Sequence, residues 1–262
     1  MLEPPQMNRA QMNCALTLTR PDGNLDQAFG AKAQHSMNIN ELNIGLIGGT
    51  GEEGRGLALR WAIAGARVSI GSRSLERAKT AADELNQLLS SRGTLPLGYG
   101  ENRNVIAESD LALLTVPFAH AASTLETHRQ DFRDGSILID ITVPVSFEQG
   151  RVRYVELPEG SASEHLKARL PENIPLVAAF KTEPAHLLAE IDEALDCDSF
   201  VASDSKEAKA RVIEAIGFID GLRAVDAGTL YSARTLERMT VLAIGINRRQ
   251  KIKTARYRVI GL

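Results

Sequence analysis

A glycine-rich turn between an apolar strand and an amphipathic helix limits the folds available to this chain. Gly49-Thr50-Gly51-Glu52-Glu53-Gly54 matches the pattern G-x-G-x-x-G and follows the apolar run at residues 44–47. In that context glycines permit the tight turn, let the backbone approach a pyrophosphate and direct a helix N-terminus at its charge. The pattern therefore predicts a dinucleotide site that includes Gly49, Thr50, Gly51, Glu52, Glu53 and Gly54. The alternative is a turn that serves only close strand–helix packing.

Further apolar runs alternate with helical patterns along the chain. They lie at residues 67–70, 111–116, 137–141 and 176–180. Strands that alternate with helices indicate a parallel, doubly wound Rossmann-type α/β sheet. Beyond residue 187 the pattern continues with a short apolar run, two helices and a strand near Val225. We therefore expect a nucleotide-binding domain at residues 41–187 and a second, smaller α/β domain at residues 188–262.

The first 40 residues differ from the rest in composition. They are rich in Asn, Gln, Pro and Ala and show no sustained hydrophobic periodicity, which is typical of a disordered terminal extension at residues 1–40. Met37 could itself be the first residue of the protein, so the alternative is an upstream start codon assigned in error. The sequence favours neither interpretation.

The end of the second predicted strand indicates which dinucleotide binds. In NAD sites a carboxylate about 20 residues beyond the glycine motif accepts hydrogen bonds from the ribose 2′-hydroxyl. This chain has Gly71-Ser72-Arg73 there instead. A hydroxyl and a guanidinium can hold a 2′-phosphate. Ser72 and Arg73 therefore predict NADP(H) as the cofactor, and the alternative for Arg73 is a solvated surface arginine.

Three later strand ends carry a proline, which favours an extended turn after the strand. Because the carboxyl ends of parallel strands meet at one edge of a sheet, we expect these turns to form one wall of a cofactor cleft. The predicted contacts are Thr115, Val116, Pro117 and His120, then Val143 and Pro144, then Lys181, Thr182 and Pro184. The alternatives are a helix-surface position for His120 and a surface ion pair between Lys181 and Glu183.

Composition and residue spacing argue against several other functions. The formal net charge of −3 gives no overall attraction to nucleic acid. No apolar run reaches the length of about 18–20 residues that a membrane span needs. The five histidines and two cysteines show no zinc spacing, and nucleophile-elbow and Walker motifs are absent. We therefore expect a cytoplasmic enzyme of hydride transfer that uses no metal and no catalytic side chain, because the cofactor supplies the chemistry.

Two features of the C-terminal part concern possible partners. The helix predicted at residues 232–247 carries an apolar face, which comprises Leu236, Met239, Leu242, Ala243 and Ile246. A small domain does not readily bury such a face, so we expect a homodimer. Residues 248–258 contain six basic residues and no acid, which indicates either a solvated tail or a patch for a polyanionic ligand or an acidic partner.

Several segments, in order along residues 43–262, carry a more specific pattern. They are Ile47-Gly48-Gly49-Thr50-Gly51, Gly71-Ser72-Arg73, residues 114–121, Val143-Pro144-Val145, and above all residues 220–228 followed by residues 232–237. Together they resemble the NADPH-dependent coenzyme F420 reductases, also called F420-dependent NADP oxidoreductases. The resemblance implies reversible hydride transfer between NADPH and the 5-deazaflavin coenzyme F420, with no essential acid–base residue.

The resemblance also implies which residues contact each part of the two coenzymes. Thr50 and its glycines would hold the pyrophosphate, Ser72 and Arg73 the 2′-phosphate, and Val116, Pro117 and His120 the nicotinamide side, whereas Val143, Pro144 and residues 181–185 would face the deazaflavin. Some members have a histidine where this chain has Lys181, and many have neutral residues where it has Glu52 and Glu53. Two other interpretations stay open: an NADPH-dependent reductase of another acceptor, such as a flavin, ferric chelate or imine, and a non-catalytic NADP(H) sensor.

Overall fold

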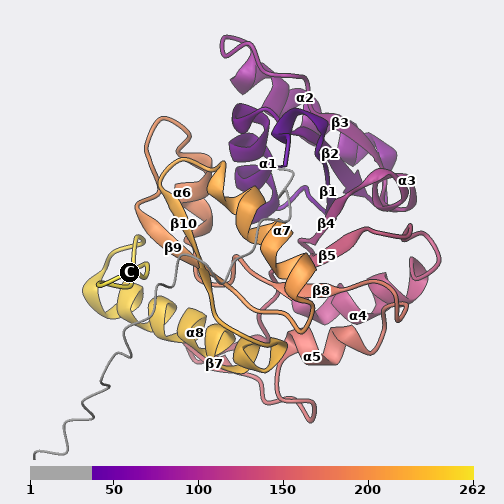
Figure 1. Cartoon of the computed structure of the whole chain (residues 1–262). Helices are drawn as coiled ribbons and strands as arrows, with labels where there is room; N and C mark the ends of the chain where they lie inside the picture. Colours follow the sequence, from indigo (N-terminus) through magenta and orange to yellow (C-terminus); the bar gives the residue numbers. More distant parts are fainter. Residues whose placement is uncertain (1–36) are drawn as a thin grey trace, which may run out of the picture. The chain divides into compact units, whose positions relative to one another are not determined.

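A six-stranded parallel sheet forms the centre of the computed structural model, which describes residues 37–262 (Figure 1). Its strands are β1 (Asn43–Ile47), β2 (Arg67–Ser72), β3 (Gly98–Glu101), β4 (Leu111–Leu114), β5 (Ile137–Asp140) and β8 (Leu176–Ala178). Their order is β3-β2-β1-β4-β5-β8, and every neighbouring pair is parallel. Because the chain starts in the middle and moves outward to each side in turn, the predicted doubly wound sheet is confirmed.

Helices cover both faces of this sheet. They are α1 (Glu52–Ala64), α2 (Leu75–Leu89), α3 (Asn102–Glu108), α4 (Phe118–Thr127), α5 (Ala162–Lys167) and α6 (Ala185–Ala189). Leu111 and Leu113 of β4 belong to a first apolar core with α1 and α2, whereas Ala112 and Leu114 belong to a second core with α4 and α5. Burial on both faces explains why the strands are continuous apolar runs in the sequence.

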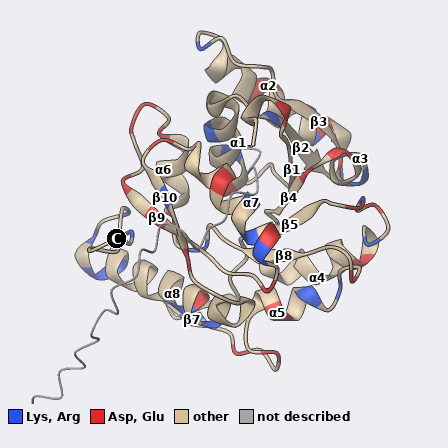
Figure 2. Ribbon diagram, in the orientation of Figure 1, with Lys and Arg blue, Asp and Glu red and all other residues tan. Residues whose placement is uncertain are grey.

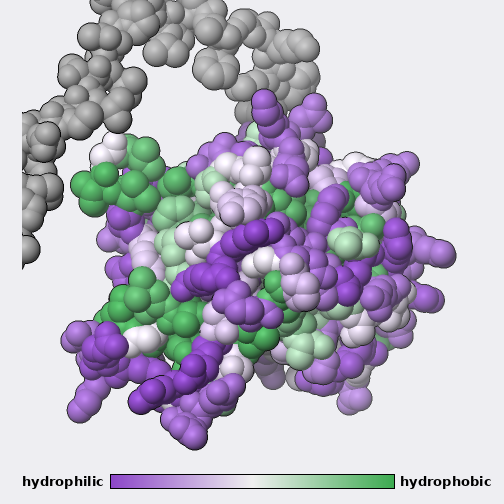
Figure 3. Space-filling model, turned by 90° about the horizontal axis from the view of Figure 1, so that it is seen from below, coloured by the Kyte–Doolittle hydropathy of each residue, from purple (hydrophilic) through white to green (hydrophobic). Residues whose placement is uncertain are grey.

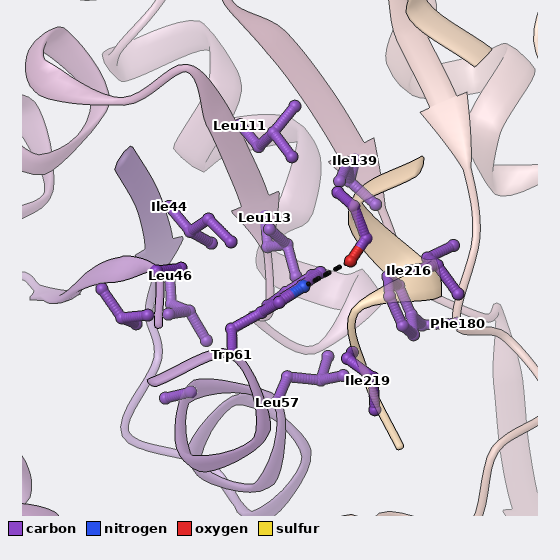
Figure 4. Packing of buried hydrophobic residues seen from close by; sticks show 14 of the residues in the cluster. Ile44, Leu46, Leu57, Trp61, Leu111, Leu113, Ile139, Phe180, Ile216 and Ile219 are labelled. Atoms are coloured by element: carbon purple, nitrogen blue, oxygen red, sulfur yellow. Dashed lines mark hydrogen bonds between the residues drawn. The ribbon is translucent and has the colours of Figure 1, made fainter. Parts of the chain in front are cut away.

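Trp61 lies in the middle of the first core (Figure 4). Its side chain is fully buried, and its ring meets Phe180 edge-on with 5.3 Å between the ring centroids. Its Nε1 donates a hydrogen bond to the Ala215 carbonyl at 3.0 Å, as a buried indole N–H requires. Ala215 belongs to α7 (Lys206–Gly217). The contact therefore fastens α1 to the C-terminal part of the chain.

The C-terminal part adds a two-stranded parallel sheet and two helices. β9 (Cys197–Val201) pairs with β10 (Leu222–Asp226), α7 connects them, and the 3-10 helix η4 (Leu230–Ser232) leads into the long α8 (Ala233–Gln250). A bridge between Ala178 and Ala202 links this part to the end of β8. Residues 37–262 form one compact unit. The smaller α/β set beyond residue 187 is therefore present, and the domain boundary at residues 187 and 188 stays a prediction.

Some local features differ from the expectations. The sequence patterns do not predict β3, α3 or the antiparallel hairpin of β6 (Val145–Glu148) and β7 (Arg151–Tyr154). β4 and β8 end at Leu114 and Ala178, earlier than predicted, which leaves the following residues free to form turns. Of the predicted extension, residues 1–36 lie outside the described residues. Met37 and Ile39, the latter in the 3-10 helix η3 (Ile39–Glu41), pack against the first core.

Charged side chains are spread over the molecule (Figure 2), and basic ones gather near the C-terminal end of α8, where Arg248 and Arg249 occupy the last helical turn. Between residues 37 and 262, no helix is both long and apolar enough to cross a membrane. The same part of the chain contains no group of three or more side chains that could hold a metal ion.

Candidate functional site

The glycine turn after β1 is closely packed on one side and open on the other. Gly48 has a φ of 74°, and a Cβ at Gly49 would lie 2.6 Å from Leu46 Cβ. A Cβ at Gly51, in contrast, would meet nothing within 4 Å. α1 begins directly after Gly51, which offers no side-chain cap. The backbone N–H groups of the first helical turn therefore adjoin open space, which is the arrangement that binds a phosphate anion.

Beside this turn lies a hollow of about 290 Å³ rich in hydrogen-bond donors, here called the arginine hollow. Its polar lining comprises Thr50, Ser72, Arg73, Ser74, Arg77, Asn102, Thr115, His120 and Thr124, and no carboxylate lines it. Ser72 is buried and also accepts a hydrogen bond from the Ser74 amide at 3.3 Å. Two guanidinium groups and several hydroxyls form a donor set that suits a phosphate ester. The residues present therefore fit the 2′-phosphate of NADP(H).

A second cleft of about 360 Å³, here called the ring cleft, adjoins the arginine hollow. The two share Gly51, Thr115, Val116 and Pro117. The ring cleft is further lined by the first turn of α1, by Phe118, by residues 141–143 after β5, by Lys181 and Glu183 after β8, and by Thr240 of α8. Its walls combine apolar side chains, among them Val116, Phe118 and Val143, with charged and polar ones, and the apolar part suits flat conjugated rings.

Most of the predicted site residues meet in these two spaces. Thr50, Gly51, Ser72, Arg73, Thr115, Val116, Pro117 and His120 line the arginine hollow, and Gly51, Glu52, Glu53, Gly54, Thr115, Val116, Pro117, Val143 and Lys181 line the ring cleft. Gly49 packs behind the turn against Leu46. Pro144, Thr182 and Pro184 line neither space, and Pro184 is the N-cap residue of α6. The contacts of all these residues with cofactor stay predictions.

Lys181 belongs to a buried ionic network. Its Nζ donates to Asp140 Oδ2 at 2.9 Å and to the Thr142 carbonyl at 2.6 Å, and lies 3.3 Å from Glu237 Oε1. Burial alone would lower the pKa of Lys181, but the charges of Asp140 and Glu237 outweigh burial and raise that pKa above its usual value. Lys181 is therefore charged and fully paired, with Asp140, Glu237 and the Thr142 carbonyl as its partners. The surface ion pair between Lys181 and Glu183 that was the alternative is therefore wrong.

Two carboxyl groups of the ring cleft have no such cationic partner. Burial raises the pKa of Glu53 to about 8, the neighbouring charges of Glu183, Asp140 and Glu52 add to the rise, and Lys181 opposes it. Burial also raises the pKa of Glu183, whose Oε2 accepts the Thr182 amide at 2.8 Å. The nearby Ser199 hydroxyl opposes this rise of the Glu183 pKa. Neither Glu183 Oε1 nor Ser199 Oγ, however, has a hydrogen-bond partner of good geometry among the described residues.

Comparison with known proteins agrees with this arrangement. The model of the family NADP oxidoreductase coenzyme F420-dependent matches residues 43–144. The F420-dependent NADP reductase of Methanothermobacter thermautotrophicus is 40% identical over 229 residues, which cover 86% of this chain and 98% of the relative. This chain belongs to the F420-dependent NADP oxidoreductase family. A third member, from Methanocaldococcus jannaschii, is 35% identical over 224 residues, which cover 84% of this chain and 99% of that relative.

Solved structures share the fold of this family member. A protein from Arthrobacter sp. FB24, assigned as an F420-dependent NADP reductase, aligns with a TM-score of 0.70 at 22% identity and covers 83% of this chain and 99% of its own. An imine reductase from Bacillus cereus aligns with a TM-score of 0.54 at 14% identity, over 80% of this chain and 62% of its own. At these identities the likeness concerns the fold alone.

Several residues of the site were not predicted from the sequence, and four of them concern its charge and shape. Arg77 lies in the first turn of α2 and lines the arginine hollow together with Arg73. Phe118 and Thr240 line the ring cleft, and Glu237 forms an ion pair with Lys181. Thr240 and Glu237 come from α8, far along the chain, so their place in the site depends on tertiary packing that no local pattern reveals.

Proposed function

We propose that this protein transfers a hydride between NADPH and the deazaflavin coenzyme F420, in either direction. One observation carries the proposal: the arginine hollow, which fits a 2′-phosphate, shares four lining residues with a second cleft of about 360 Å³ that has apolar walls at Val116, Phe118 and Val143. Family membership supports the second substrate, because relatives that match nearly over their full length are F420-dependent NADP reductases.

The residues around the two spaces would divide the work of binding. Ser72, Arg73 and Arg77 would hold the 2′-phosphate, and the N-terminus of α1 with Thr50 would hold the pyrophosphate. Val116, Pro117 and His120 would face the nicotinamide side. Val143, Lys181 and Glu183, which line the ring cleft, would face the deazaflavin. The bound coenzymes supply the hydride donor and acceptor, while the protein aligns the two rings and excludes water.

The test is to mix the purified protein with oxidised F420 and either NADPH or NADH, and to follow the loss of the visible absorbance of the deazaflavin. Rapid bleaching with NADPH and slow bleaching with NADH is the expected result. Binding of NADPH without bleaching would contradict the proposal and would favour another acceptor or a sensor.

We also propose that the protein is a cytoplasmic homodimer. Leu236 and Ala243 of α8 are buried within the chain itself and are therefore not available to a partner. Other apolar side chains are exposed, including Leu242 of α8 and Phe147 of the β6–β7 hairpin at 56% and 68%. Apolar residues also gather on the side of the molecule where α8 and the C-terminus lie (Figure 3). Sedimentation as a monomer at micromolar concentration would contradict a dimer.

The buried free thiol of Cys197 is compatible with a reducing compartment.

A further inference from the structure

The basic run near the C-terminus divides into a paired part and an unpaired part. The guanidinium groups of Arg256 and Arg258 lie 3.6–4.0 Å from carboxylate oxygens of Asp196 and Asp198. The other four basic residues are exposed and form no ion pair within residues 37–262; they are Arg248, Arg249, Lys251 and Lys253. These four lie at the C-terminal end of α8 (Figure 2). This end of the helix therefore carries positive charge that the described part of the chain does not neutralise.

Two of these cations line a hollow. The hollow has a volume of about 420 Å³ and is here called the basic pocket. Its lining comprises Arg248, Lys253, His186, Glu52, Ala185, Ile244, Asn247 and Ile252. The carboxylate of Glu52 faces two permanent cations, Arg248 and Lys253, so positive charge exceeds negative charge in the lining. The basic pocket therefore favours an anionic group.

The turn after α8 holds Lys253 at the basic pocket. Lys251 ends the helix with a φ of 55°. Asn247 then accepts two hydrogen bonds, one at its carbonyl from the Ile252 amide and one at its side-chain oxygen from the Ala255 amide, each at 2.9 Å. The segment that carries Lys253 is thus fixed beside the last helical turn. Cations near a helix C-terminus also suit the helix dipole, but the dipole does not explain why His186 of α6 lines the same pocket.

The basic pocket continues the ring cleft. Glu52 lines both spaces. Thr240 of the ring cleft and Ile244 and Arg248 of the basic pocket are spaced four apart, so one face of α8 lines both. The loop after β8 behaves in the same way, since residues 181 and 183 line the cleft and residues 185 and 186 line the pocket. The arginine hollow, in contrast, shares no lining residue with the basic pocket. The ring cleft therefore adjoins two separate cationic spaces.

We propose that the basic pocket binds the negatively charged side chain of the acceptor coenzyme, an inference that rests on the proposed function. NADPH has its own anion sites in the arginine hollow and at the glycine turn, so the basic pocket is left for the second coenzyme. An acceptor ring in the ring cleft extends its side chain past Glu52 toward Arg248 and Lys253. F420 meets this requirement, because the side chain on its ring carries phosphate and carboxylate groups. The two cations thus select an acceptor with an acidic side chain over a neutral one with the same ring.

The test compares two acceptors that share one ring. The first is F420, and the second is the same 5-deazaflavin with an uncharged side chain that ends in a hydroxyl group. For each acceptor, kcat/KM is measured at saturating NADPH in the wild type and in the double variant Arg248→Gln/Lys253→Gln. The ratio of kcat/KM for F420 to kcat/KM for the uncharged acceptor should fall by about 4-fold to 25-fold in the variant. Each cation is exposed, and an exposed ion pair contributes about 2-fold to 5-fold.

The matched control removes one arginine and one lysine elsewhere. Arg103→Gln/Lys206→Gln changes the net charge by the same amount at exposed positions of α3 and α7, outside the ring cleft and the basic pocket. This control should keep the wild-type ratio. Salt gives a second readout, because ions screen exposed charges. The ratio should fall with rising ionic strength in the wild type and fall less steeply in Arg248→Gln/Lys253→Gln.

The outcomes separate the two proposals. If the wild type reduces neither acceptor, the proposed function fails, and the inference that rests on it fails with it. If the wild type reduces both acceptors and the ratio stays the same in Arg248→Gln/Lys253→Gln, only the role of the basic pocket is overturned. A loss of NADPH affinity in that variant, measured by fluorescence titration, would also overturn it, because the pocket would then serve the dinucleotide.

Discussion

Arg73→Ala should weaken NADPH binding selectively, because Arg73 and Arg77 are the two cations of the arginine hollow and no carboxylate competes for them there. A hydrogen bond to a charged group contributes about 1.5–3 kcal/mol. Since 1.4 kcal/mol corresponds to about tenfold in affinity, the loss for NADPH should lie between about 10-fold and 150-fold. Arg73 is exposed in the free protein, which favours the lower part of that range.

The measurement is a pair of fluorescence titrations, one with NADPH and one with NADH, for the wild type and each variant. NADH lacks the 2′-phosphate, so its dissociation constant should stay nearly unchanged in Arg73→Ala. Arg77 remains in that variant, and only the double change of Arg73 and Arg77 should remove the preference for NADPH. Arg103→Ala, in which an exposed arginine of α3 outside the hollow is lost, controls for overall charge.

Two results would refute this reasoning. An unchanged ratio of NADPH to NADH affinity in Arg73→Ala would mean that the 2′-phosphate binds elsewhere. An equal loss for both nucleotides would mean that Arg73 supports the shape of the turn rather than binding the phosphate. The affinity for NADPH should also decrease with salt more steeply in the wild type than in the variant, because a phosphate–arginine contact is screened by ions.

Three further changes test the framework of the site by urea unfolding. Lys181→Met leaves two buried carboxylates without their cation and should lower the free energy of unfolding by about 3–5 kcal/mol, whereas Lys206→Met, at an exposed position, should change it little. Trp61→Ala should lower it by about 3–5 kcal/mol, since it removes a fully buried ring and its hydrogen bond. Asp198→Asn weakens the bidentate contact that Arg223 makes at 2.8 Å and that lowers the Asp198 pKa. That contribution is complete above the ordinary value of 3.8 and is lost as the pH falls through the lowered pKa, so the difference between variant and wild type should shrink in acid.

The parts of the fold that local chemistry determines could be predicted from the sequence. The strand, glycine turn and helix at residues 44–64 follow from an apolar run, a permissive backbone and residues spaced four apart. β3 was missed because its residues, Gly98–Glu101, include two glycines and one glutamate and lack the β-branched side chains that indicate strands. The β6–β7 hairpin was also missed. Its strands are only partly buried, and they follow directly on a segment that was interpreted as a cleft wall.

The site shows where local patterns stop being informative. The prolines after three strands correctly indicated turns at one edge of the sheet, because parallel topology brings those ends together. The charge state of the turns could not be deduced in the same way. Lys181 is predicted from the sequence as a cofactor contact, with a surface ion pair as the alternative, yet its ammonium is buried against Asp140 from another strand end and Glu237 from α8. Its pairing, and therefore the lack of a cation for Glu53 and Glu183, depends on residues 41 and 56 positions away in the chain.

The buried ionic network gives the ring cleft a fixed geometry and leaves its proton content adjustable. Lys181 holds the end of β5, through Asp140, and α8, through Glu237, at one point, and Glu237 is itself fixed by the Ala162 amide at 2.9 Å. Phe180, just before Lys181, has a φ of 53°, an unfavourable conformation for a bulky residue that the surrounding core must support. The same contacts use up the one cation of the cleft lining and leave none for the carboxyl groups of Glu53 and Glu183. Burial raises the pKa of both groups, that of Glu53 to about 8, so the charge of the ring cleft depends on the pH.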